Sequence, residues 1–171
     1  MSTIQVNITY ALRYVPADAN GTDASDIYTT ATGYGEPVQG QPRGVAPPGA
    51  QSWFLSPVEG KEDVYKITSA ERPNLPFTLE GPDHVLPSWG LPGNKGVPTG
   101  HHDPILLKVC EVEWRIKQDE GGYHTISPVK TDGRLGVVYY VDFDERLRIL
   151  YIKGIPVIRD PPPAPKWELI C

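Results

Sequence analysis

The chain contains little cysteine and no long apolar run, and each scarcity excludes a class of protein. Among its 171 residues only two are cysteines, Cys110 in an apolar run and Cys171 at the end, too few for a disulfide framework. We therefore expect two free thiols, the usual state in a cytosolic protein. No stretch of about eighteen apolar residues occurs, so no segment is predicted to span a membrane. The first residues lack the basic and apolar regions of a secretory signal, and we expect a cytoplasmic protein.

Positive charge is also scarce. The chain has 16 Lys and Arg residues against 21 Asp and Glu, which gives a net charge of −5, and it has no basic run. Binding of nucleic acid requires Lys and Arg side chains that replace the counterions of the phosphates. The sequence therefore predicts no nucleic-acid partner.

Signatures of catalysis are missing as well. The chain has no Gly-x-Ser-x-Gly segment, no His-Glu-x-x-His segment and no glycine-rich phosphate loop with its lysine. The adjacent histidines His101 and His102, followed by Asp103, would point apart on an extended loop and are not predicted to hold a metal ion. We expect no enzyme, no cofactor and no metal site.

What the sequence does contain is a threefold pattern of aromatic residues. Trp53, Trp114 and Trp167 stand at nearly even intervals, and a charged, glycine-containing turn follows each of the first two. After each turn a tyrosine begins a new apolar segment, and the tyrosine that matches Trp167 lies near the other end of the chain. These tyrosines are Tyr65, Tyr123 and Tyr10. A repeat of about fifty to sixty residues, closed by the N-terminal segment, predicts a circular threefold arrangement.

The rest of the pattern favours β-structure. Nineteen prolines and seventeen glycines leave few stretches long enough for a helix. The longest uninterrupted stretches, 105–120 and 137–153, are rich in strand-forming residues. In the first, the apolar positions change parity, which predicts a bulge near Val109. In the second, Asp142, Asp144 and Glu145 are predicted to be solvated residues at a hairpin tip.

Many short strands and a threefold repeat predict an all-β fold, a β-trefoil of twelve strands in three pseudo-repeats. The whole chain, 1–171, would form one domain with units near 8–60, 61–120 and 121–171. The three repeated tryptophans are predicted to lie on the last strand of each unit and to fill the core. Trp89 has no repeat partner, and the sequence leaves open whether it caps the barrel or lies exposed on a long loop, 81–104.

The order of several motifs in about the first eighty residues resembles the mycocypins, the clitocypin- and macrocypin-like cysteine-protease inhibitors of mushrooms. The closing segment Lys166-Trp-Glu-Leu169 matches as well. The motifs that carry the resemblance are Tyr10-Ala-Leu-Arg-Tyr-Val15, Tyr28-Thr-Thr30, Glu36-Pro-Val-Gln39, Gln51-Ser-Trp53, Tyr65-Lys-Ile-Thr68 and Pro73-Asn-Leu-Pro-Phe77. This resemblance implies a monomeric β-trefoil that reversibly blocks papain-like cysteine proteases.

In the mycocypins, two neighbouring loops wedge into the active-site cleft and cover the catalytic cysteine. By resemblance, these loops match 20–26 and 42–51 of this chain. The residues implied to contact a papain-like protease are Asn20, Gly21, Thr22, Asp23, Ala24, Ser25, Asp26, Arg43, Gly44, Val45, Ala46, Pro47, Pro48 and Gly49. The family has a Gly-Gly pair in the first loop where this chain has Ala24-Ser25-Asp26, and residues with a Cβ reorient less freely.

A third loop of the family inhibits legumain by presenting an asparagine to its primary pocket. The matching residue here is Asn74, which Pro73 and Pro76 would display on a stiff, extended backbone. Arg72 and Arg43 leave open inhibition of trypsin-like serine proteases, which recognise a basic side chain.

A carbohydrate-binding trefoil is the main alternative function. Gln51-Ser-Trp53 matches the Gln-x-Trp signature of ricin-B-like lectins, but Val112 and Pro165 replace the glutamine before the other two tryptophans. The signature thus occurs in one unit of three. A trefoil that uses its loops on another target, such as a toxin or an anti-nematode protein, is a further alternative.

Overall fold

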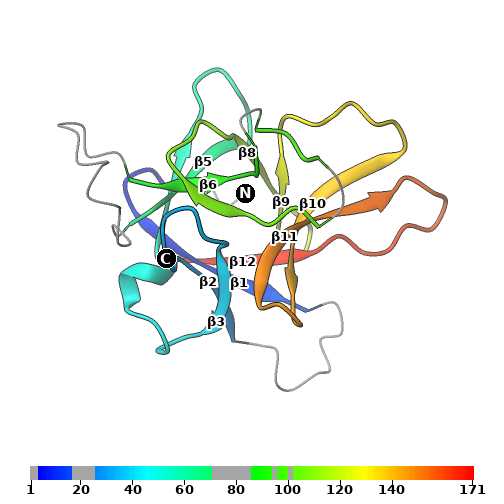
Figure 1. Cartoon of the computed structure of the whole chain (residues 1–171). Helices are drawn as coiled ribbons and strands as arrows, with labels where there is room; N and C mark the ends of the chain where they lie inside the picture. Colours follow the sequence, from blue (N-terminus) through cyan, green and yellow to red (C-terminus); the bar gives the residue numbers. More distant parts are fainter. Residues whose placement is uncertain (1–3, 17–25, 71–85, 94–95, 100–101) are drawn as a thin grey trace.

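The structure is a computed structural model that describes residues 4–16, 26–70, 86–93, 96–99 and 102–171. The described residues form twelve strands and one short 3-10 helix (Figure 1). The strands are β1 (Thr9–Val15), β2 (Ile27–Thr30), β3 (Gln39–Pro42), β4 (Trp53–Pro57), β5 (Val64–Ser69), β6 (Ser88–Gly90), β7 (Leu106–Lys108), β8 (Trp114–Gln118), β9 (His124–Pro128), β10 (Val137–Asp144), β11 (Ile149–Pro156) and β12 (Lys166–Ile170), and helix η1 is Pro48–Gln51. Within these residues, no helix has the length and apolar character needed to cross a bilayer.

Six of the strands close into a barrel. Strands β1, β4, β5, β8, β9 and β12 are each hydrogen-bonded to two others of the set, and the circuit returns from β12 to β1. All six pairings are antiparallel. Closure leaves no unpaired edge in the barrel, so its backbone groups are satisfied internally.

The other six strands form three hairpins, β2–β3, β6–β7 and β10–β11, which meet around a threefold axis. The backbone N–H of Val38 donates to the carbonyl of Ile105 (2.8 Å), Ile105 donates to Leu150 (3.0 Å), and Leu150 donates back to Val38 (2.9 Å). All three residues have no exposed surface. A closed ring of three equivalent bonds, together with the six-stranded barrel, identifies the β-trefoil fold and confirms the predicted class.

Each repeated tryptophan lies on the last strand of its unit, as predicted. The indole N–H of Trp53 donates to the carbonyl of Thr29 (3.2 Å), that of Trp114 to Trp89 (3.1 Å), and that of Trp167 to Val141 (3.0 Å). Each acceptor is on the second strand of the same unit. All three tryptophans are fully buried, so the same side chain fills the same position three times.

Trp89 belongs to the core, and neither sequence-based alternative for it is correct. It lies on β6, has no exposed surface, and packs edge-on between Trp53 and Trp114, with ring centroids 5.5 and 6.1 Å away. The prediction of a continuous loop over 81–104 is therefore wrong at β6. Sequence analysis did not predict this strand, because it has only three residues and lies between Pro87 and Pro92.

Two other sequence-based details need correction. The predicted bulge near Val109 is a break between two strands: β7 ends at Lys108 in a hairpin, and β8 begins at Trp114 in the barrel. The change of parity marks the passage from one layer to the other. The third hairpin turns at residues 145–148 instead of 142–145, because Asp144 pairs with Ile149. Asp144 and Glu145 lie at its tip, but Asp142 is buried, with 6% of its surface exposed.

Candidate functional site

The β3–β4 loop, residues 43–52, is the best-described part of the predicted site. It leaves β3 through a turn in which Gly44 has a φ of +88°, a conformation that residues with a Cβ adopt only with strain. The next residue, Val45, is 68% exposed although its side chain is apolar. Pro47 and Pro48 then lead into η1 and limit the backbone conformations of the middle of the loop.

A buried glutamine fixes the base of this loop. The side-chain amide of Gln51, which is 4% exposed, donates to the hydroxyl of Thr30 (3.1 Å) and to the carbonyl of Pro42 (3.1 Å). The hydroxyl of Ser52 donates to the carbonyl of Pro48 (2.8 Å). The two ends of the loop are thus tied to each other and to β2, while its tip remains in solvent.

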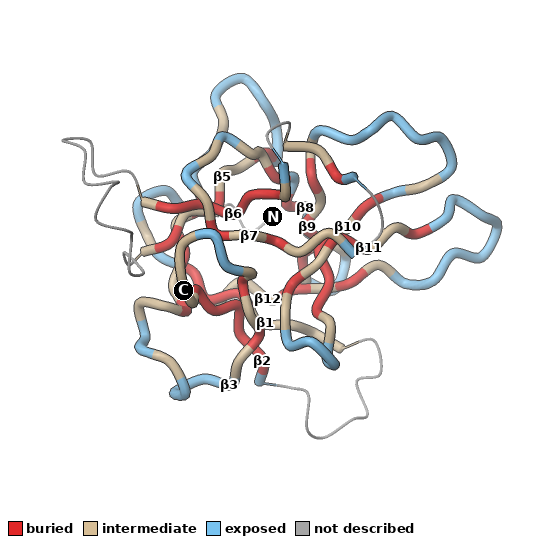
Figure 2. Tube along the Cα trace, in the orientation of Figure 1, coloured by how far each residue is buried: buried red, intermediate tan, exposed pale blue. Residues whose placement is uncertain are grey.

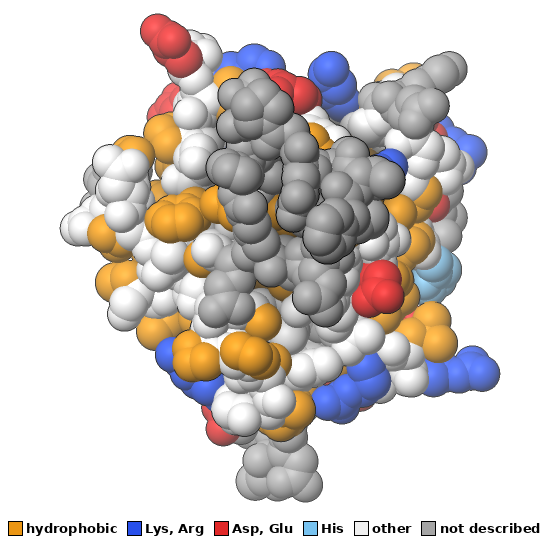
Figure 3. Space-filling view, turned by 60° about the vertical axis from the view of Figure 1, so that its left-hand side comes forward, with side chains coloured by type: hydrophobic (Ala, Val, Ile, Leu, Met, Phe, Trp, Pro, Cys, Tyr) orange, Lys and Arg blue, Asp and Glu red, His pale blue; other side chains and the backbone are white. Residues whose placement is uncertain are grey.

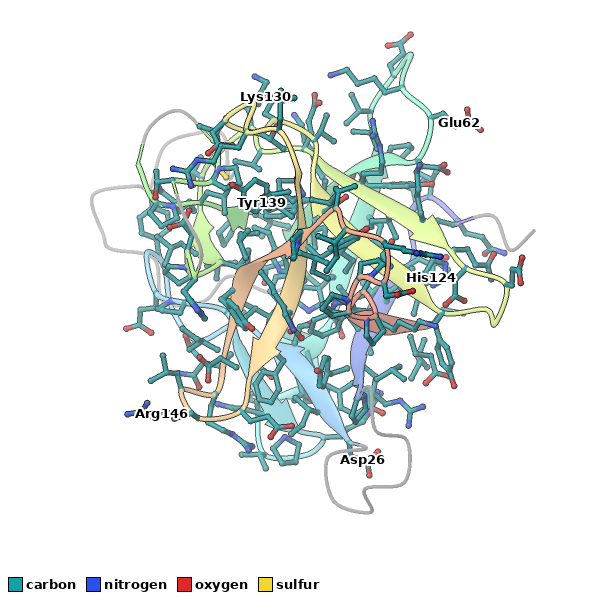
Figure 4. All side chains as sticks on the ribbon, turned by 90° about the vertical axis from the view of Figure 1, so that its right-hand side faces the viewer. Asp26, Glu62, His124, Lys130, Tyr139 and Arg146 are labelled. Atoms are coloured by element: carbon teal, nitrogen blue, oxygen red, sulfur yellow. The ribbon has the colours of Figure 1, made fainter. Side chains whose placement is uncertain are left out.

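The β1–β2 loop, residues 16–26, ends next to the start of the β3–β4 loop. Ile27 pairs with Pro42 in the β2–β3 ladder, so Asp26 and Arg43 continue from neighbouring positions. Asp26 is exposed and 3.9 Å from the guanidinium of Arg13, which also pairs with Glu168 (Figure 4). The structure therefore brings the described ends of the two predicted loops together.

The described residues of the β3–β4 loop are exposed in different degrees. Arg43, Gly44, Val45, Pro47 and Pro48 are exposed, and Ala46 and Gly49 are half-buried. The remaining predicted contact residues, Asn20, Gly21, Thr22, Asp23, Ala24 and Ser25, lie outside the described residues.

The sequence matches the family model of the peptidase inhibitor clitocypin over residues 9–169. The chain belongs to this family. Its members are peptidase inhibitors and not enzymes. Among curated proteins, none matches the sequence.

Two solved structures resemble the clitocypin-family chain in fold. One is the designed 3-fold symmetric protein ThreeFoil, with a TM-score of 0.59 and 12% identity, over 95% of this chain and 98% of that one. The other comes from "Structure and mode of action of a mosquitocidal holotoxin", with a TM-score of 0.57 and 16% identity. It covers 98% of this chain but only 17% of the toxin chain. At these identities the likeness shows the trefoil fold alone.

Two further residues of interest in this clitocypin-family chain, Asn74 and Arg72, lie outside the described residues. The last described residue before them is Ala70. Its backbone N–H donates to the carbonyl of Ser52 (3.0 Å), at the end of the β3–β4 loop. The segment that leads to Asn74 therefore starts beside that loop.

The arginine of the β3–β4 loop lies against the sheet. The guanidinium of Arg43 is 5.1 Å from the centroid of the Tyr28 ring, within the range of a cation–π contact. Tyr28 is buried on β2. The contact holds the side chain of Arg43 against β2, where β3 ends.

The Gln-x-Trp signature is explained by the scaffold. Gln51 ties the β3–β4 loop, and Trp53 fills a repeated core position; both are buried. Neither side chain is placed to contact a sugar. Sequence analysis could not find the role of Gln51, because its partner Thr30 is 21 residues away.

Three features of the described residues bear on metal binding and nucleophilic chemistry. In this part of the chain, no group of three His, Cys, Asp or Glu side chains is arranged to hold a metal ion. Burial raises the pKa of the Cys110 thiol, so this thiol is protonated at neutral pH and a poor nucleophile. Burial also lowers the pKa of His124, and its imidazole is neutral.

The side of the molecule that lies on the left in Figure 1 faces forward in Figure 3. Apolar and uncharged side chains cover most of its described surface, and charged groups lie mainly toward the rim (Figure 3).

Proposed function

We propose that this member of the clitocypin family inhibits papain-like cysteine proteases by covering the active-site cleft with the β1–β2 and β3–β4 loops. The observation that carries the proposal is the β3–β4 loop, which displays Val45 to solvent on a base fixed by Gln51. The described end of the β1–β2 loop, Asp26, lies beside it. The two loops would enter the active-site cleft of the protease from both sides.

The inhibition would be steric and reversible. A loop that is fixed before binding loses little conformational entropy when a partner captures it, which increases affinity. No residue of the inhibitor would form a bond with the catalytic cysteine. Because Ala24-Ser25-Asp26 stands in place of the Gly-Gly pair of the family, we assign the larger share of the binding energy to the β3–β4 loop.

The substitution Val45→Asp tests this assignment. It would bury an unpaired carboxylate at the interface, and we expect the inhibition constant for papain to rise about tenfold to a hundredfold. The measurement is residual papain activity against increasing inhibitor. Val157→Asp is a matched control. Val157 is 64% exposed, close to the 68% of Val45, but it lies in a different unit of the trefoil. If wild-type protein leaves papain fully active, or both variants weaken inhibition equally, the proposal is wrong.

Inhibition of legumain through Asn74 is the second part of the proposal. It rests on the position of Asn74 between Pro73 and Pro76 in the sequence and on family membership. Asn74→Ala should abolish inhibition of legumain and leave inhibition of papain unchanged, in parallel assays of the two enzymes. Loss of both inhibitory activities would mean that this segment supports the scaffold.

The alternatives gain little from the described residues. Arg43, a candidate for a trypsin-like pocket, packs on Tyr28, and the residues of the lectin-like signature are buried. Glycan-array binding by a protein that leaves papain and legumain active would favour the lectin alternative.

A further inference from the structure

The β11–β12 loop, residues 157–165, is the third-unit counterpart of the β3–β4 loop. Each follows the third strand of its unit and leads into the tryptophan strand. Strand β3 ends at Pro42 and strand β11 at Pro156. Figure 1 places the two loops on different sides of the barrel, as threefold symmetry requires.

This loop presents an unusual run of exposed side chains. Val157 and Ile158 are 64% and 57% exposed, and Arg159 and Asp160 are exposed as well. Figure 2 shows most of the trace between β11 and β12 as exposed. Among the described residues, Arg159 has neither an ion-pair partner nor an aromatic ring beneath it, whereas Arg43 packs on Tyr28. Two aliphatic side chains followed by a free arginine have the chemistry of a peptide that trypsin-like proteases recognise.

The loop is held at both ends and stiffened between them. The N–H of Val157 donates to the carbonyl of Gly136 (2.8 Å), and the N–H of Ile158 donates to that of Pro156 (3.1 Å). At the other end, Lys166 pairs with Val15 in the barrel. Three consecutive prolines, 161–163, fix φ along the middle of the loop.

An apolar hollow of about 370 Å³ lies next to the loop. Its walls come from β10 and β11 and from the prolines of the loop, and include Val138, Tyr140, Ile155, Pro161 and Ala164. Val138 is 41% exposed. Exposed apolar surface around a hollow is typical of protein-binding sites.

We propose that the β11–β12 loop is a further inhibitory loop, separate from those directed at papain and legumain, and that it acts on serine proteases with an acidic primary pocket. Arg159 enters that pocket, where a buried carboxylate pairs with its guanidinium. Val157 and Ile158 contact the enzyme surface before the pocket, and the hollow receives an apolar side chain of the enzyme. No bond is broken, because prolines 161–163 restrict the backbone after Asp160 and the ends of the loop are fixed in the scaffold.

Inhibition of trypsin by the full chain and by three variants tests this proposal. Arg159→Ala should raise the inhibition constant about a hundredfold or more, as expected for a central arginine of an interface, and Arg159→Lys should change it by less than about tenfold. Arg146→Ala is the matched control, since Arg146 is exposed at the β10–β11 turn (Figure 4). Thermal unfolding of each variant confirms that it is folded.

Three outcomes would overturn the proposal: active trypsin at saturating wild-type protein, unchanged inhibition by Arg159→Ala, or rapid cleavage after Arg159 detected by mass spectrometry. The proposal does not depend on inhibition of papain. Val45→Asp should leave trypsin inhibition unchanged, and protein saturated with papain should still bind trypsin. Failure of one inhibitory activity is therefore distinguishable from failure of the other.

Discussion

At the scale of single residues, Asp142 organises a buried polar cluster between β1, β10 and β11. Its carboxylate accepts the N–H of Phe143 (2.8 Å) and the hydroxyl of Tyr151 (3.4 Å), and lies 3.5 Å from the ammonium of Lys153. A buried carboxylate needs such partners to offset the loss of hydration. Burial and the charge of Asp142 raise the pKa of Tyr14, on the other side of the cluster.

The same cluster makes the stability of the protein depend on pH in the alkaline range. Burial, with the charges of Asp142 and Asp144, raises the pKa of Tyr151 to about 12, above the usual value of about 10. The contribution of the protonated Tyr151 to stability is therefore complete below about pH 10 and is lost as pH rises through about 12. The free energy of unfolding should fall over this interval. Urea denaturation at several pH values measures it.

Asp142→Asn should move the titration of Tyr151 to lower pH, as followed by tyrosinate absorbance, because one of the charges that raise the pKa is removed. The exposed Asp160 provides the control: Asp160→Asn should leave that titration unchanged. Identical curves for wild type and Asp142→Asn would contradict the assignment.

At the scale of elements, the loops differ in how they are fixed. The base of the β3–β4 loop is fixed by the buried side chain of Gln51, whereas the β11–β12 loop is held by backbone hydrogen bonds at its ends and stiffened by its prolines. Sequence analysis predicted the β3–β4 loop from its prolines and glycines, but it did not predict the hydrogen bonds of Gln51 and did not single out the β11–β12 loop. Hydrogen bonds such as that of Gln51 to Thr30 join residues far apart in the chain, so they cannot be predicted from the local sequence pattern.

Gln51→Ala should cost about 1–3 kcal/mol of unfolding free energy, because Thr30 and the carbonyl of Pro42 lose a buried donor. Inhibition of papain should weaken as well, since the loop is no longer fixed before binding. Gln41→Ala is the comparison, because the amide of Gln41 is only half-buried and donates to Gln39. Equal losses of stability in the two variants would show that the buried hydrogen bonds of Gln51 do not stabilise the fold more than an ordinary surface contact.

At the scale of the whole molecule, the ring of Val38, Ile105 and Leu150 joins the three units. Sequence analysis could find the threefold repeat, because the tryptophans recur at equivalent positions. It missed the ring. Glu36-Pro-Val38 and Asp103-Pro-Ile105 are similar, but the third segment is Arg148-Ile-Leu150, so the pattern is broken in one unit of three.

Since each member of the ring donates to one hairpin and accepts from another, the three should open together. We expect the amide hydrogens of Val38, Ile105 and Leu150 to exchange with deuterium only through global unfolding, with similar and maximal protection. Exchange followed by NMR measures this. Fast exchange at one of the three alone would show that its hairpin opens independently.

The pairing of β1 with β12 makes the first and last strands neighbours, from Ala11 opposite Ile170 to Val15 opposite Lys166. The chain thus travels once around a circle and returns to its starting point. The order of the strands around the barrel therefore has no intrinsic first member, and the chain termini could lie between any two of the three units. New loops can therefore evolve in one unit without changing how the strands of the other two units are connected.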